Sequence, residues 1–511
     1  MSAPDAFYVT TPIYYVNDSP HIGHAYTSLA CDAIARFARL DGRRVRFLTG
    51  TDEHGQKVEK AARAAGMEPQ AFTDLVSQRF RGLATLLDLT PDDFIRTTEE
   101  RHRRGVQAFW QKLVEAGAIY LGRYAGWYSV RDEAYYAESE LVDGRAPTGA
   151  PVEWVEEPSY FFRLSAWQER LLAFYAAHPD FVLPQSRYNE VVSFVRGGLT
   201  DLSVSRTTFR WGIPVPGDPD HVVYVWLDAL TNYITALGYP DTDNELFRTF
   251  WPADLHVIGK DILRFHAVYW PAFLMAAGLE PPKRVFAHGW WTNEGQKISK
   301  SLGNVIDPVE LVGRYGLDQT RYFLLREVPF GQDGDFRHEA MVRRINHDLA
   351  NDYGNLAQRV LSLIARHCEG RMPEPEGLCS DDEALLALAY ALLPRTRAAM
   401  REQALHRALE AIFEVIGEAN RYVDTMAPWV LRKTDPTRMR TVLWTLAETL
   451  RHIATLTQPF VPRASARLLD QLGVPPQRRD FAALGPDGTP VVPGTPLPPP
   501  EPIFPRWQET P

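Results

Sequence analysis

The sequence predicts an α/β fold that contains a parallel sheet and is followed by a bundle of α-helices. Near the N-terminus, short apolar runs alternate with helical patterns, which is typical of parallel strands joined by right-handed crossovers. From about residue 338 onwards, apolar residues recur at helical spacing only. The chain has 511 residues, which is too many for one hydrophobic core, so roughly three or four domains are expected.

The first α/β unit begins close to the N-terminus. Strands are predicted at residues 7–10 and 45–48, a loop at 17–20, and helices from Ile22 to Gly42 and from 56 to 65. Aromatic residues then interrupt the alternation, and we expect a small β-rich insertion there: Tyr120, Tyr124, Trp127, Tyr128, Tyr135 and Tyr136. The α/β pattern returns with strand-like apolar runs at residues 222–226, 255–258 and 284–287.

The C-terminal part is predicted to be helical. One apolar stripe ends at Gly370 and comprises Ile345, Leu349, Leu356, Val360 and Ile364; similar patterns cover residues 405–429 and 441–456. Such stripes are buried between packed helices, so a bundle is expected. From residue 474 the chain is rich in proline, which predicts an extended peptide on the surface or a flexible end.

Composition limits the environment of the protein but does not determine its function. No uncharged apolar stretch of about 18 residues occurs, and residues 1–5 lack the segments of a signal peptide, so no membrane is expected. Cys31, Cys368 and Cys379 are too scattered for a disulfide framework, which favours a reducing cytoplasm. The net charge of -9 argues mildly against a nucleic-acid partner, although a local basic face would suffice for one.

His21, Gly23 and His24 lie between a predicted strand and the start of a predicted helix. The unpaired N–H groups and the positive dipole end of a helix N-terminus suit phosphate. Two histidines one turn apart add donors for the charge that develops on a transferred phosphate, and the glycine leaves room for a nucleotide. The alternatives are a chance pattern or a pair of metal ligands.

Lys297, Ser299 and Lys300 lie in a polar loop far along the chain. Two lysines that flank a serine can hold a triphosphate and neutralise the leaving pyrophosphate. Taken alone, a solvated basic turn is the more ordinary interpretation. Together, the two segments resemble the HIGH and KMSKS motifs of class I aminoacyl-tRNA synthetases in order and in context. This resemblance implies a Rossmann-like catalytic domain that takes ATP with Mg²⁺.

Further segments resemble the methionyl-tRNA synthetases among these enzymes: residues 11–17, 51–55, 225–229, 259–262 and 286–290. The resemblance implies that methionine contacts Ile13, Tyr15, Asp52, Trp226, Ala229, Tyr233 and His288. It implies that ATP contacts His21, Gly23, His24, Gly259, Asp261, Lys297, Ser299 and Lys300. It also implies catalytic roles for His21, His24, Lys297, Lys300 and Arg206.

Physical chemistry supports part of this assignment. A thioether side chain is apolar and flexible, so it suits a pocket lined by aromatic rings. The substrate ammonium needs a carboxylate, and Asp52 follows a predicted strand, at the edge where open parallel sheets bind ligands. Other interpretations stay open. Trp226 and Tyr233 could be core aromatics, and Asp52 could cap a helix. Arg206 could form a surface salt bridge.

In the helical part, Asn355 and Arg359 are four residues apart and therefore share a helix face. Their side chains suit exposed base edges, and the indole of Trp429 offers a surface on which a base can stack. By itself, Trp429 would be expected in the bundle core. These segments resemble the anticodon-binding residues of methionyl-tRNA synthetases, which implies tRNA(Met), including the initiator tRNA, as a partner.

The sequence departs from many members of this family because no cysteine occurs between Cys31 and Cys368. The insertion is therefore expected to lack structural zinc and to be held by its aromatic residues. The chain also ends soon after the helical part, so a monomer is expected. The predicted domains are a catalytic domain in two halves (1–115 and 221–290), a connective insertion (116–220), a linking segment with the lysine loop (291–340), a helical anticodon-binding domain (341–473) and a proline-rich tail (474–511).

The function that the resemblance implies is methionine activation by ATP to methionyl-adenylate, followed by transfer to the 3′-terminal adenosine of tRNA(Met). Alternatives are a class I synthetase for another apolar amino acid, a small-molecule nucleotidyltransferase with the HIGH motif, and a tRNA-binding relative without catalysis. The anticodon residues argue against the nucleotidyltransferase, which needs no RNA-binding domain. Retention of both histidines and both lysines argues against the inactive relative.

Overall fold

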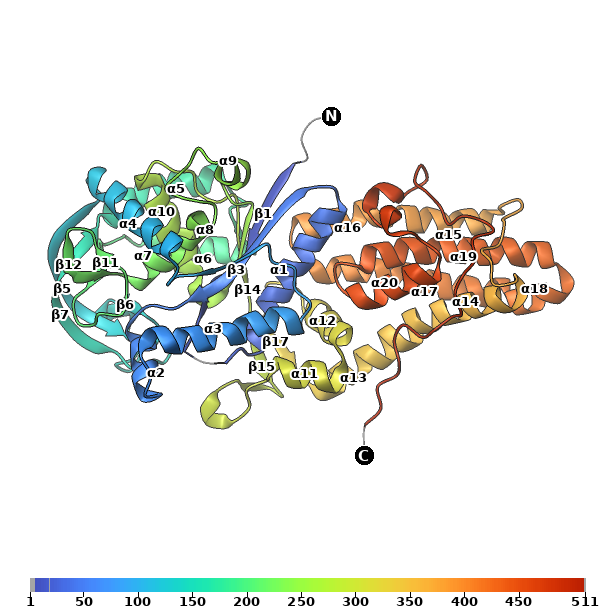
Figure 1. Cartoon of the computed structure of the whole chain (residues 1–511), viewed down its shortest axis with the longest axis horizontal. Coiled ribbons are helices and arrows are strands. Elements are labelled where there is room, and N and C mark those ends of the chain that lie inside the picture. The colour runs from blue at the N-terminus through green and yellow to red at the C-terminus, as the bar shows by residue number, and fades with distance from the viewer. Residues whose placement is uncertain (1–4, 18, 510–511) are drawn as a thin grey trace. The chain divides into compact units, whose positions relative to one another are not determined.

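A computed structural model describes residues 5–17 and 19–509 (Figure 1). Residues 1–4, Asp18 of the predicted loop, and residues 510–511 of the predicted tail lie outside the described residues. The chain divides into two compact units. The first, which we call the sheet unit, comprises Ala6–Pro20 and Arg46–His288; the second, the bundle unit, comprises Met1–Asp5, His21–Val45 and Gly289–Pro511. Each is described by itself.

The sheet unit is built on a seven-stranded sheet in the order β2-β3-β1-β13-β14-β8, with β4 paired to β3. Its strands are β1 (Ala6–Thr10), β2 (Tyr14–Tyr15), β3 (Arg44–Asp52), β4 (Asp93–Arg96), β8 (Val182–Leu183), β13 (Leu255–Gly259) and β14 (Val285–His288). The pairs β1–β13, β13–β14, β14–β8, β2–β3 and β3–β4 are all parallel. The predicted parallel sheet is therefore confirmed, with strands at 7–10, 45–48, 255–258 and 284–287.

The order of this sheet reverses at β1, because β3 lies on one side of β1 and β13 on the other. In open parallel sheets, ligands bind at such a reversal, beyond the carboxyl ends of the strands. The carboxyl ends of β3, β13 and β14 are Asp52, Gly259 and His288. Three residues predicted from the sequence thus lie at the ligand-binding edge of one sheet.

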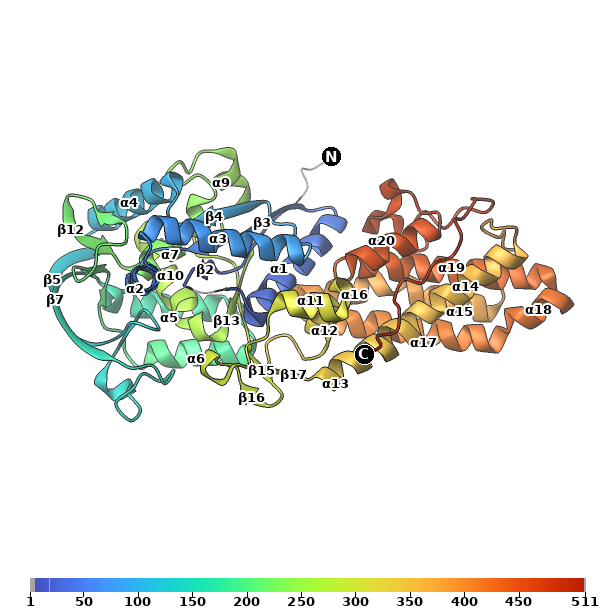
Figure 2. The same cartoon turned by 60° about the horizontal axis from the view of Figure 1, so that its bottom comes forward.

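The predicted β-rich insertion is also confirmed. An antiparallel sheet in the order β6-β5-β7-β9 contains β5 (Ile119–Ser129), β6 (Ala134–Tyr136), β7 (Glu153–Phe162) and β9 (Leu202–Ser203). Its long β5–β7 hairpin forms a curved ribbon in both views (Figures 1 and 2). Aromatic pairs stabilise it: the ring centroids of Tyr124 and Tyr135 are 4.6 Å apart, and those of Trp127 and Trp154 are 5.3 Å apart.

The predicted strand at residues 222–226 is wrong as a strand of the main sheet. Val222 and Val223 end β12 (Asp218–Val223), which pairs with β10 (Ser205–Arg206) and β11 (Pro214–Val215) in a small antiparallel sheet. The helix α7 (Val225–Leu230) starts two residues later, and all six of its residues are buried. A short apolar run with no polar face has the same pattern in a buried strand and in a buried helix. In addition, β8 of the main sheet lies within the range predicted for the insertion.

The remaining helices of the sheet unit cover its sheet and the insertion. They are α2 (Gln56–Ala64), α3 (Pro69–Leu86), α4 (Glu100–Glu115), α5 (Gln168–Ala177), α6 (Gln185–Arg196), α8 (Asn232–Thr235), α9 (Glu245–Phe250) and α10 (Trp270–Ala276). Short helices are η1 (Glu138–Glu140), η2 (Leu164–Trp167), η3 (Lys260–Ile262) and the π-helical η4 (Phe265–Tyr269). One large apolar core includes Tyr8 of β1, Trp110 of α4 and Trp270 of α10.

The bundle unit is mainly helical. Its helices are α1 (Ile22–Leu40), α11 (Pro308–Tyr315), α12 (Leu317–Arg326), α13 (His338–Arg343), the π-helical η6 (Arg344–Gly354), α14 (Asn355–His367), α15 (Ser380–Tyr390), α16 (Leu392–Arg401), α17 (Leu405–Met426), α18 (Pro428–Thr434), α19 (Pro436–Thr457) and α20 (Pro462–Gln471). Shorter pieces are β15 (Trp291–Asn293), β16 (Gln296–Lys297), β17 (Gly334–Phe336), η5 (Lys300–Leu302), η7 (Pro476–Arg478) and η8 (Phe481–Ala483).

Local sequence explains where several of these helices begin and end. α1 stops before Gly42, whose φ of 81° favours glycine. α17 stops where Ala427 adopts a φ of 46° before Pro428, so a second helix begins in place of the long one predicted to Trp429. The predicted apolar stripe of the bundle is confirmed, since these residues are all buried: Ile345, Leu349, Leu356, Val360 and Ile364.

The described part of the tail lies along the bundle unit. The backbone N–H of Trp507 donates to Asn346 Oδ1 at 2.8 Å, and its indole N–H donates to the carbonyl of Arg314 at 3.0 Å. Arg467 and Gln471 of α20 bind the tail carbonyls of Ile503 and Glu501. The tail is therefore a peptide packed on the bundle unit, as the first of the two predictions held, but it also contains the short helices η7 and η8 and buries Phe481, Ile503 and Phe504. No helix in residues 5–17 and 19–509 is long and apolar enough to cross a membrane.

Candidate active site

Asp52 is a buried carboxylate with an unsatisfied oxygen at the ligand-binding edge of the sheet. Its side chain is 2% exposed, and no hydrogen-bond donor among the described residues reaches Oδ1. Burial, and then the nearby charges of Asp228 and Glu133, raise the pKa of Asp52 well above its usual value. A buried anion that lacks a partner is costly, so this site favours a cationic ligand group. Helix capping is not its role, because the N-cap of α2 is Gly55.

An aromatic group lies in the same unit. The indole of Trp226 stacks on Phe265 with ring centroids 3.9 Å apart, and Tyr15 meets the indole edge-on at 6.4 Å. Within the described chain, neither Trp226 Nε1 nor the Tyr15 hydroxyl has a hydrogen-bond partner. Trp226 and Tyr233 do belong to the large core, as the alternative interpretation held, but a buried indole N–H without a partner is unusual for a residue with only a core role.

His266 and Phe265 complete this aromatic group, and sequence analysis missed both. The Tyr233 hydroxyl is 2.7 Å from His266 Nε2, and His266 Nδ1 is 3.0 Å from the carbonyl of Ile262. A carbonyl only accepts, so the network assigns the imidazole proton to Nδ1 and the acceptor role to Nε2. Burial lowers the pKa of His266 to about 4, which keeps it neutral. His266 follows the carboxyl end of β13 by seven residues, and this position was the sequence signal that could have identified it.

His288 and His266 come from different elements: His288 ends β14, whereas His266 lies on η4. As the last residue of β14 it pairs with Gly259, the last residue of β13. A Cβ atom on Gly259 would lie 2.5 Å from Asp261 Oδ1, so the absence of a side chain at Gly259 lets the Asp261 carboxyl lie close to the backbone there. The structure thus groups His288 with the residues predicted for ATP. This position favours a nucleotide ligand, and the predicted contact of His288 with methionine stays a prediction, as do those of Ile13 and Ala229.

Arg206 lies on β10 and is 1% exposed. Its Nε is 2.5 Å from Glu157 Oε1, and its guanidinium lies 4.1 Å from the ring centroid of Tyr128. The alternative of a surface salt bridge is therefore wrong, because the ion pair is buried. Its NH1 has no hydrogen-bond partner within residues 5–17 and 19–509, so this nitrogen is available to donate to a ligand. The catalytic role of Arg206 stays a prediction.

In the bundle unit, His21 and His24 form a reciprocal cap at the start of α1. The backbone N–H of Gly23 donates to His21 Nδ1 at 3.0 Å, and the backbone N–H of His21 donates to His24 Nδ1 at 3.1 Å. Each Nδ1 is an acceptor in this cap, so Nε2 is the nitrogen of each ring that carries a proton. Burial, followed by the charge of His21, lowers the pKa of His24 well below its usual value.

Gly23 is required by this cap. A Cβ atom at this position would lie 2.9 Å from Cε1 of the His21 ring, which folds over the first turn of the helix. The glycine was predicted to leave room for a nucleotide, and the structure shows that it also leaves room for the His21 ring. The cap fixes the direction of both imidazoles before any ligand binds, which is the preorganisation that electrostatic catalysis needs.

The lysine loop (residues 297–303) follows a hairpin of β15 and β16. Asn304 organises it: Asn304 Oδ1 accepts from the Ser299 N–H at 2.8 Å, and Asn304 Nδ2 donates to the Lys297 carbonyl at 3.1 Å. Ser299 caps η5 by accepting from the Leu302 N–H at 3.3 Å. Sequence analysis missed Asn304, although an asparagine beside Gly303, whose φ is 63°, is a typical turn signal.

The start of α1 contacts the segments on both sides of the lysine loop within the bundle unit. The backbone N–H of Ile22 donates to the carbonyl of Ile306 at 3.1 Å. Tyr26 of α1 also packs edge-on against Trp291 of β15, with ring centroids 5.4 Å apart. Two segments that are distant in the sequence are thus held in one unit. Imidazole donors and ammonium groups in one unit suit a polyphosphate.

The predicted anticodon residues lie on α14 and α18. Asn355 is the exposed first residue of α14, and Arg359 follows one turn later. The Arg359 guanidinium lies 5.4 Å from the ring centroid of Trp429 and binds Asp424 at 2.7 Å. Trp429 is 39% exposed, so the expectation that it would be core by itself is wrong. The structure brings Arg359 and Trp429 together on a surface where a base could stack.

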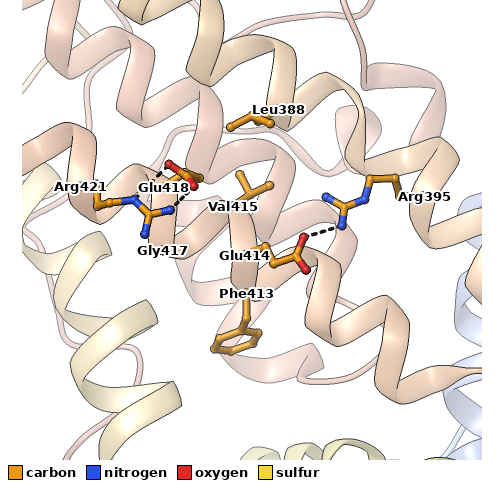
Figure 3. Close-up of a pocket in the computed structure, with 8 residues that line it drawn as sticks. All are labelled: Leu388, Arg395, Phe413, Glu414, Val415, Gly417, Glu418 and Arg421. Atoms are coloured by element: carbon orange, nitrogen blue, oxygen red, sulfur yellow. Dashed lines mark hydrogen bonds and ion pairs between the residues drawn. The ribbon is translucent and has the colours of Figure 1, made fainter.

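A pocket on α17 and a group of possible metal ligands on η6 are two further features of the bundle unit, and neither indicates a ligand site. A pocket of about 370 Å³ on α17 is lined by Leu388, Arg395, Phe413, Glu414, Val415, Gly417, Glu418 and Arg421 (Figure 3). Its two arginines are each paired with a glutamate of the same rim, so no spare cation faces it. The group His347, Asp348 and Asp352 has the spacing of metal ligands, but Asp348 is already paired with Arg344 at 3.0 Å.

Comparison with known proteins gives matches over the whole chain. The family described as tRNA synthetases class I (M) matches residues 7–151 and 140–361, and the anticodon binding domain of methionyl tRNA ligase matches residues 372–509. A methionine–tRNA ligase of Brucella suis is 59% identical over 510 residues, covering 99% of this chain and 98% of that protein. One of Mesorhizobium japonicum is 58% identical over 512 residues, covering 99% of each.

The solved structures agree with these matches. Mycobacterium tuberculosis methionyl-tRNA synthetase in complex with methionyl-adenylate has a TM-score of 0.96 and 56% identity, over 98% of this chain and 100% of that chain. The free form of the same protein has a TM-score of 0.90 and 52% identity, over 99% of each chain.

Proposed function

Because this chain belongs to the methionine–tRNA ligase family of class I aminoacyl-tRNA synthetases, we propose roles for its residues in that reaction. The enzyme activates methionine with ATP and esterifies the amino acid onto tRNA. The observation that supports the site most directly is the unsatisfied, buried carboxylate of Asp52 at the carboxyl edge of the sheet. The class I synthetase for another amino acid, the nucleotidyltransferase and the inactive relative are not favoured.

Methionine binds in the sheet unit. The substrate ammonium pairs with Asp52, and its thioether lies against the rings of Trp226 and Tyr233. Sulfur and aromatic rings attract one another, and the flexible side chain fills the space without a directional polar contact. Ile13, Tyr15 and Ala229 line the rest of this pocket. Ammonium recognition and thioether packing together fix the direction of the substrate carboxylate.

In the first step, the methionine carboxylate attacks the α-phosphate of ATP, and pyrophosphate leaves. Negative charge grows on the phosphate oxygens and on the leaving group. The Nε2–H groups of His21 and His24 donate to this charge, and the ammonium groups of Lys297 and Lys300 neutralise it. Gly259 and Asp261 contact the nucleoside, and His288, whose contact with methionine was predicted, lies beside them at the end of β14. No residue needs to form a covalent bond with the substrate.

In the second step, the terminal ribose of tRNA(Met) attacks the carbonyl of methionyl-adenylate, and AMP leaves. Membership of the class implies the 2′-hydroxyl as the nucleophile. Arg206 is a buried cation of the sheet unit, and its NH1, which has no partner among the described residues, donates to the adenylate. The tRNA is selected through Asn355, Arg359 and Trp429, which suit base edges and base stacking. The initiator tRNA shares the anticodon and is a substrate too.

Methionine-dependent ATP–pyrophosphate exchange, measured with all twenty amino acids, tests this function. We expect exchange with methionine alone. In a Lys300→Ala variant, exchange should fall by about ten- to a hundredfold, because one exposed cation no longer stabilises the leaving pyrophosphate. Lys112→Ala, which removes an exposed lysine of α4, is the control and should exchange normally. Exchange with a different amino acid would contradict the proposed methionine pocket. No exchange with any amino acid would favour the relative that binds tRNA without catalysis.

Replacing Trp429 with alanine tests the anticodon surface. Loss of one stacked base costs about 1–3 kcal/mol, so kcat/KM for tRNA(Met) should fall by about ten- to a hundredfold. Pyrophosphate exchange without tRNA should not change. The control is Val430→Ala on the same exposed turn of α18, which removes apolar surface but no ring. Equal losses in both variants would mean that the indole itself does not bind a base.

We further propose a cofactor, an oligomeric state and a location for this protein. Mg²⁺ enters on ATP: the residues proposed at the phosphates are imidazoles and ammonium groups, so phosphate oxygens and water are the ligands that it prefers. The insertion needs no zinc because aromatic pairs such as Tyr124–Tyr135 hold it. The protein is a cytoplasmic monomer, in keeping with its tRNA substrate and with Cys31, Cys368 and Cys379, none of which forms a disulfide. Native mass spectrometry should give a mass of 57.9 kDa without zinc; a doubled mass or bound zinc would contradict this.

A further inference from the structure

A buried carboxylate next to the methionine pocket holds two histidines and has no part in the chemistry described above. Asp228 lies on α7 and is completely buried. Its Oδ2 is 2.7 Å from His54 Nδ1, and its Oδ1 is 2.7 Å from His102 Nε2. Both histidines are buried as well, at 2% and 0% exposure. All three residues belong to the sheet unit.

These hydrogen bonds join the elements that hold the methionine pocket. His54 lies two residues after Asp52 in the turn that follows β3, and its backbone N–H is near enough to the Asp52 carboxyl to oppose the rise in the pKa of that group. Asp228 lies between Trp226 and Ala229 on α7, so the same helix presents the aromatic wall. The imidazole–carboxylate bond therefore ties the ammonium-binding turn to the thioether-binding helix.

The second histidine fixes the other side of the carboxylate. His102 lies on α4, and its Nδ1 is 2.8 Å from the Thr235 hydroxyl of α8. Gly105 of α4 allows this close approach, because a Cβ atom there would lie 2.2 Å from the Thr235 methyl group. The carboxylate of Asp228 is thus held from two sides and has one possible orientation.

A purely structural role is the simplest alternative, but the energetics do not favour it. Burial raises the pKa of Asp228, and only the charges and hydrogen bonds of His54 and His102 bring it below its usual value. A buried charged network of this kind contributes little net stability compared with apolar packing. The negative charge also raises the pKa of the neighbouring Asp52. A costly group beside a binding site is better explained by a need for exact geometry.

We infer that Asp228 is a positioning residue for methionine: through its hydrogen bonds to His54 and His102, it fixes the Asp52 carboxylate relative to the aromatic wall on α7. This inference rests on the proposed role of Asp52. Asp228 itself does not touch the substrate in this arrangement. The distance between the ammonium site and the thioether site is then set by the buried network, and the network contributes to the selection of the amino acid.

The test compares variants that keep or remove each hydrogen-bond donor. The amide nitrogen of asparagine takes the place of imidazole Nδ1, so His54→Asn keeps the donor to Asp228 and His54→Ala removes it. Glutamine in the same way takes the place of Nε2, so His102→Gln keeps its donor and His102→Ala removes it. In Asp228→Asn, the new amide N–H faces the N–H of one of the two histidines, so the hydrogen bond to that histidine is lost. Asp254→Asn is the control, since Asp254 accepts from the Tyr8 N–H elsewhere in the unit.

Pyrophosphate exchange gives KM for methionine, KM for ATP and kcat for each variant. We expect Asp228→Asn and both alanine variants to raise KM for methionine by about ten- to a hundredfold, the range for losing a hydrogen bond to a charged group. KM for ATP should stay within about twofold. His54→Asn, His102→Gln and Asp254→Asn should behave like the unmodified protein. A general loss of structure would instead change both KM values and kcat together.

An unchanged KM for methionine in Asp228→Asn would overturn the inference, and so would equal losses in His54→Asn and His54→Ala. If Asp228→Asn does not fold, as judged by circular dichroism, the two His54 variants alone decide the question. Asp52→Asn, assayed alongside, separates this inference from the proposed function. Normal methionine binding in Asp52→Asn would reject the role of Asp52 itself, whereas loss there with normal binding in Asp228→Asn would reject only the positioning role.

Discussion

Replacing Asp52 with asparagine is expected to lower kcat/KM for methionine by about 10²–10³-fold, the loss that follows when one partner of a buried ion pair is removed. Asparagine has the same shape, so the turn after β3 should be retained. The substrate ammonium would then enter a buried site with no counter-charge. Pyrophosphate exchange at varied methionine concentration measures this effect, and KM for ATP serves as the internal reference.

The pH dependence of the unmodified protein provides a second check. Protonated Asp52 is neutral and cannot pair with an ammonium group. Because its pKa in the free protein is raised, kcat/KM for methionine should fall as the pH drops through that value and level off above it. The acid limb should therefore occur at a higher pH than for an ordinary carboxyl group, and it should disappear in Asp52→Asn. An identical acid limb in both proteins would assign the titration to another group.

The double variant His21→Asn, His24→Gln is expected to lower kcat for exchange by about 10³-fold, because it removes both imidazole donors to the transferred phosphate. The start of α1 should survive. Asparagine is a favourable N-cap residue, and glutamine three positions later completes a capping box in the same way as the two histidines. The measurement is exchange at saturating methionine and ATP, together with the thermal unfolding midpoint.

His21→Ala provides the matched comparison for this variant. It removes the imidazole and the cap together, so it should lose activity and also about 1 kcal/mol of stability. If the double variant unfolds as easily as His21→Ala, the capping argument fails. If it folds normally and exchanges at the usual rate, the two histidines contribute only to helix structure, and the charge on the phosphate must be stabilised by other groups.

Much of the fold could be predicted from the sequence because its signals are local. Gly42 marks a helix end by its own backbone preference, whereas the helix end before Pro428 was missed although proline gives the same kind of local signal. Asp52 could be placed at a strand end because the apolar run of β3 stops there. The prediction failed at residues 222–226, where an apolar run without a polar face is compatible with a strand or a buried helix. There the neighbours of Val225 decided the outcome, and neighbours are not visible in a short segment.

The sequence by itself determined the class of enzyme, the helix that begins at His21, the loop with Lys297 and Lys300, and the parallel sheet. These depend on residue type and on spacing along the chain, which a single sequence contains. Only the tertiary structure decided which histidine lies against Trp226, that Arg206 is buried on Glu157, and that Asp228 joins His54 to His102. The physical reason is that these partners are far apart in the sequence, and a side chain's protonation, hydrogen bonds and exposure depend on what the fold places next to it.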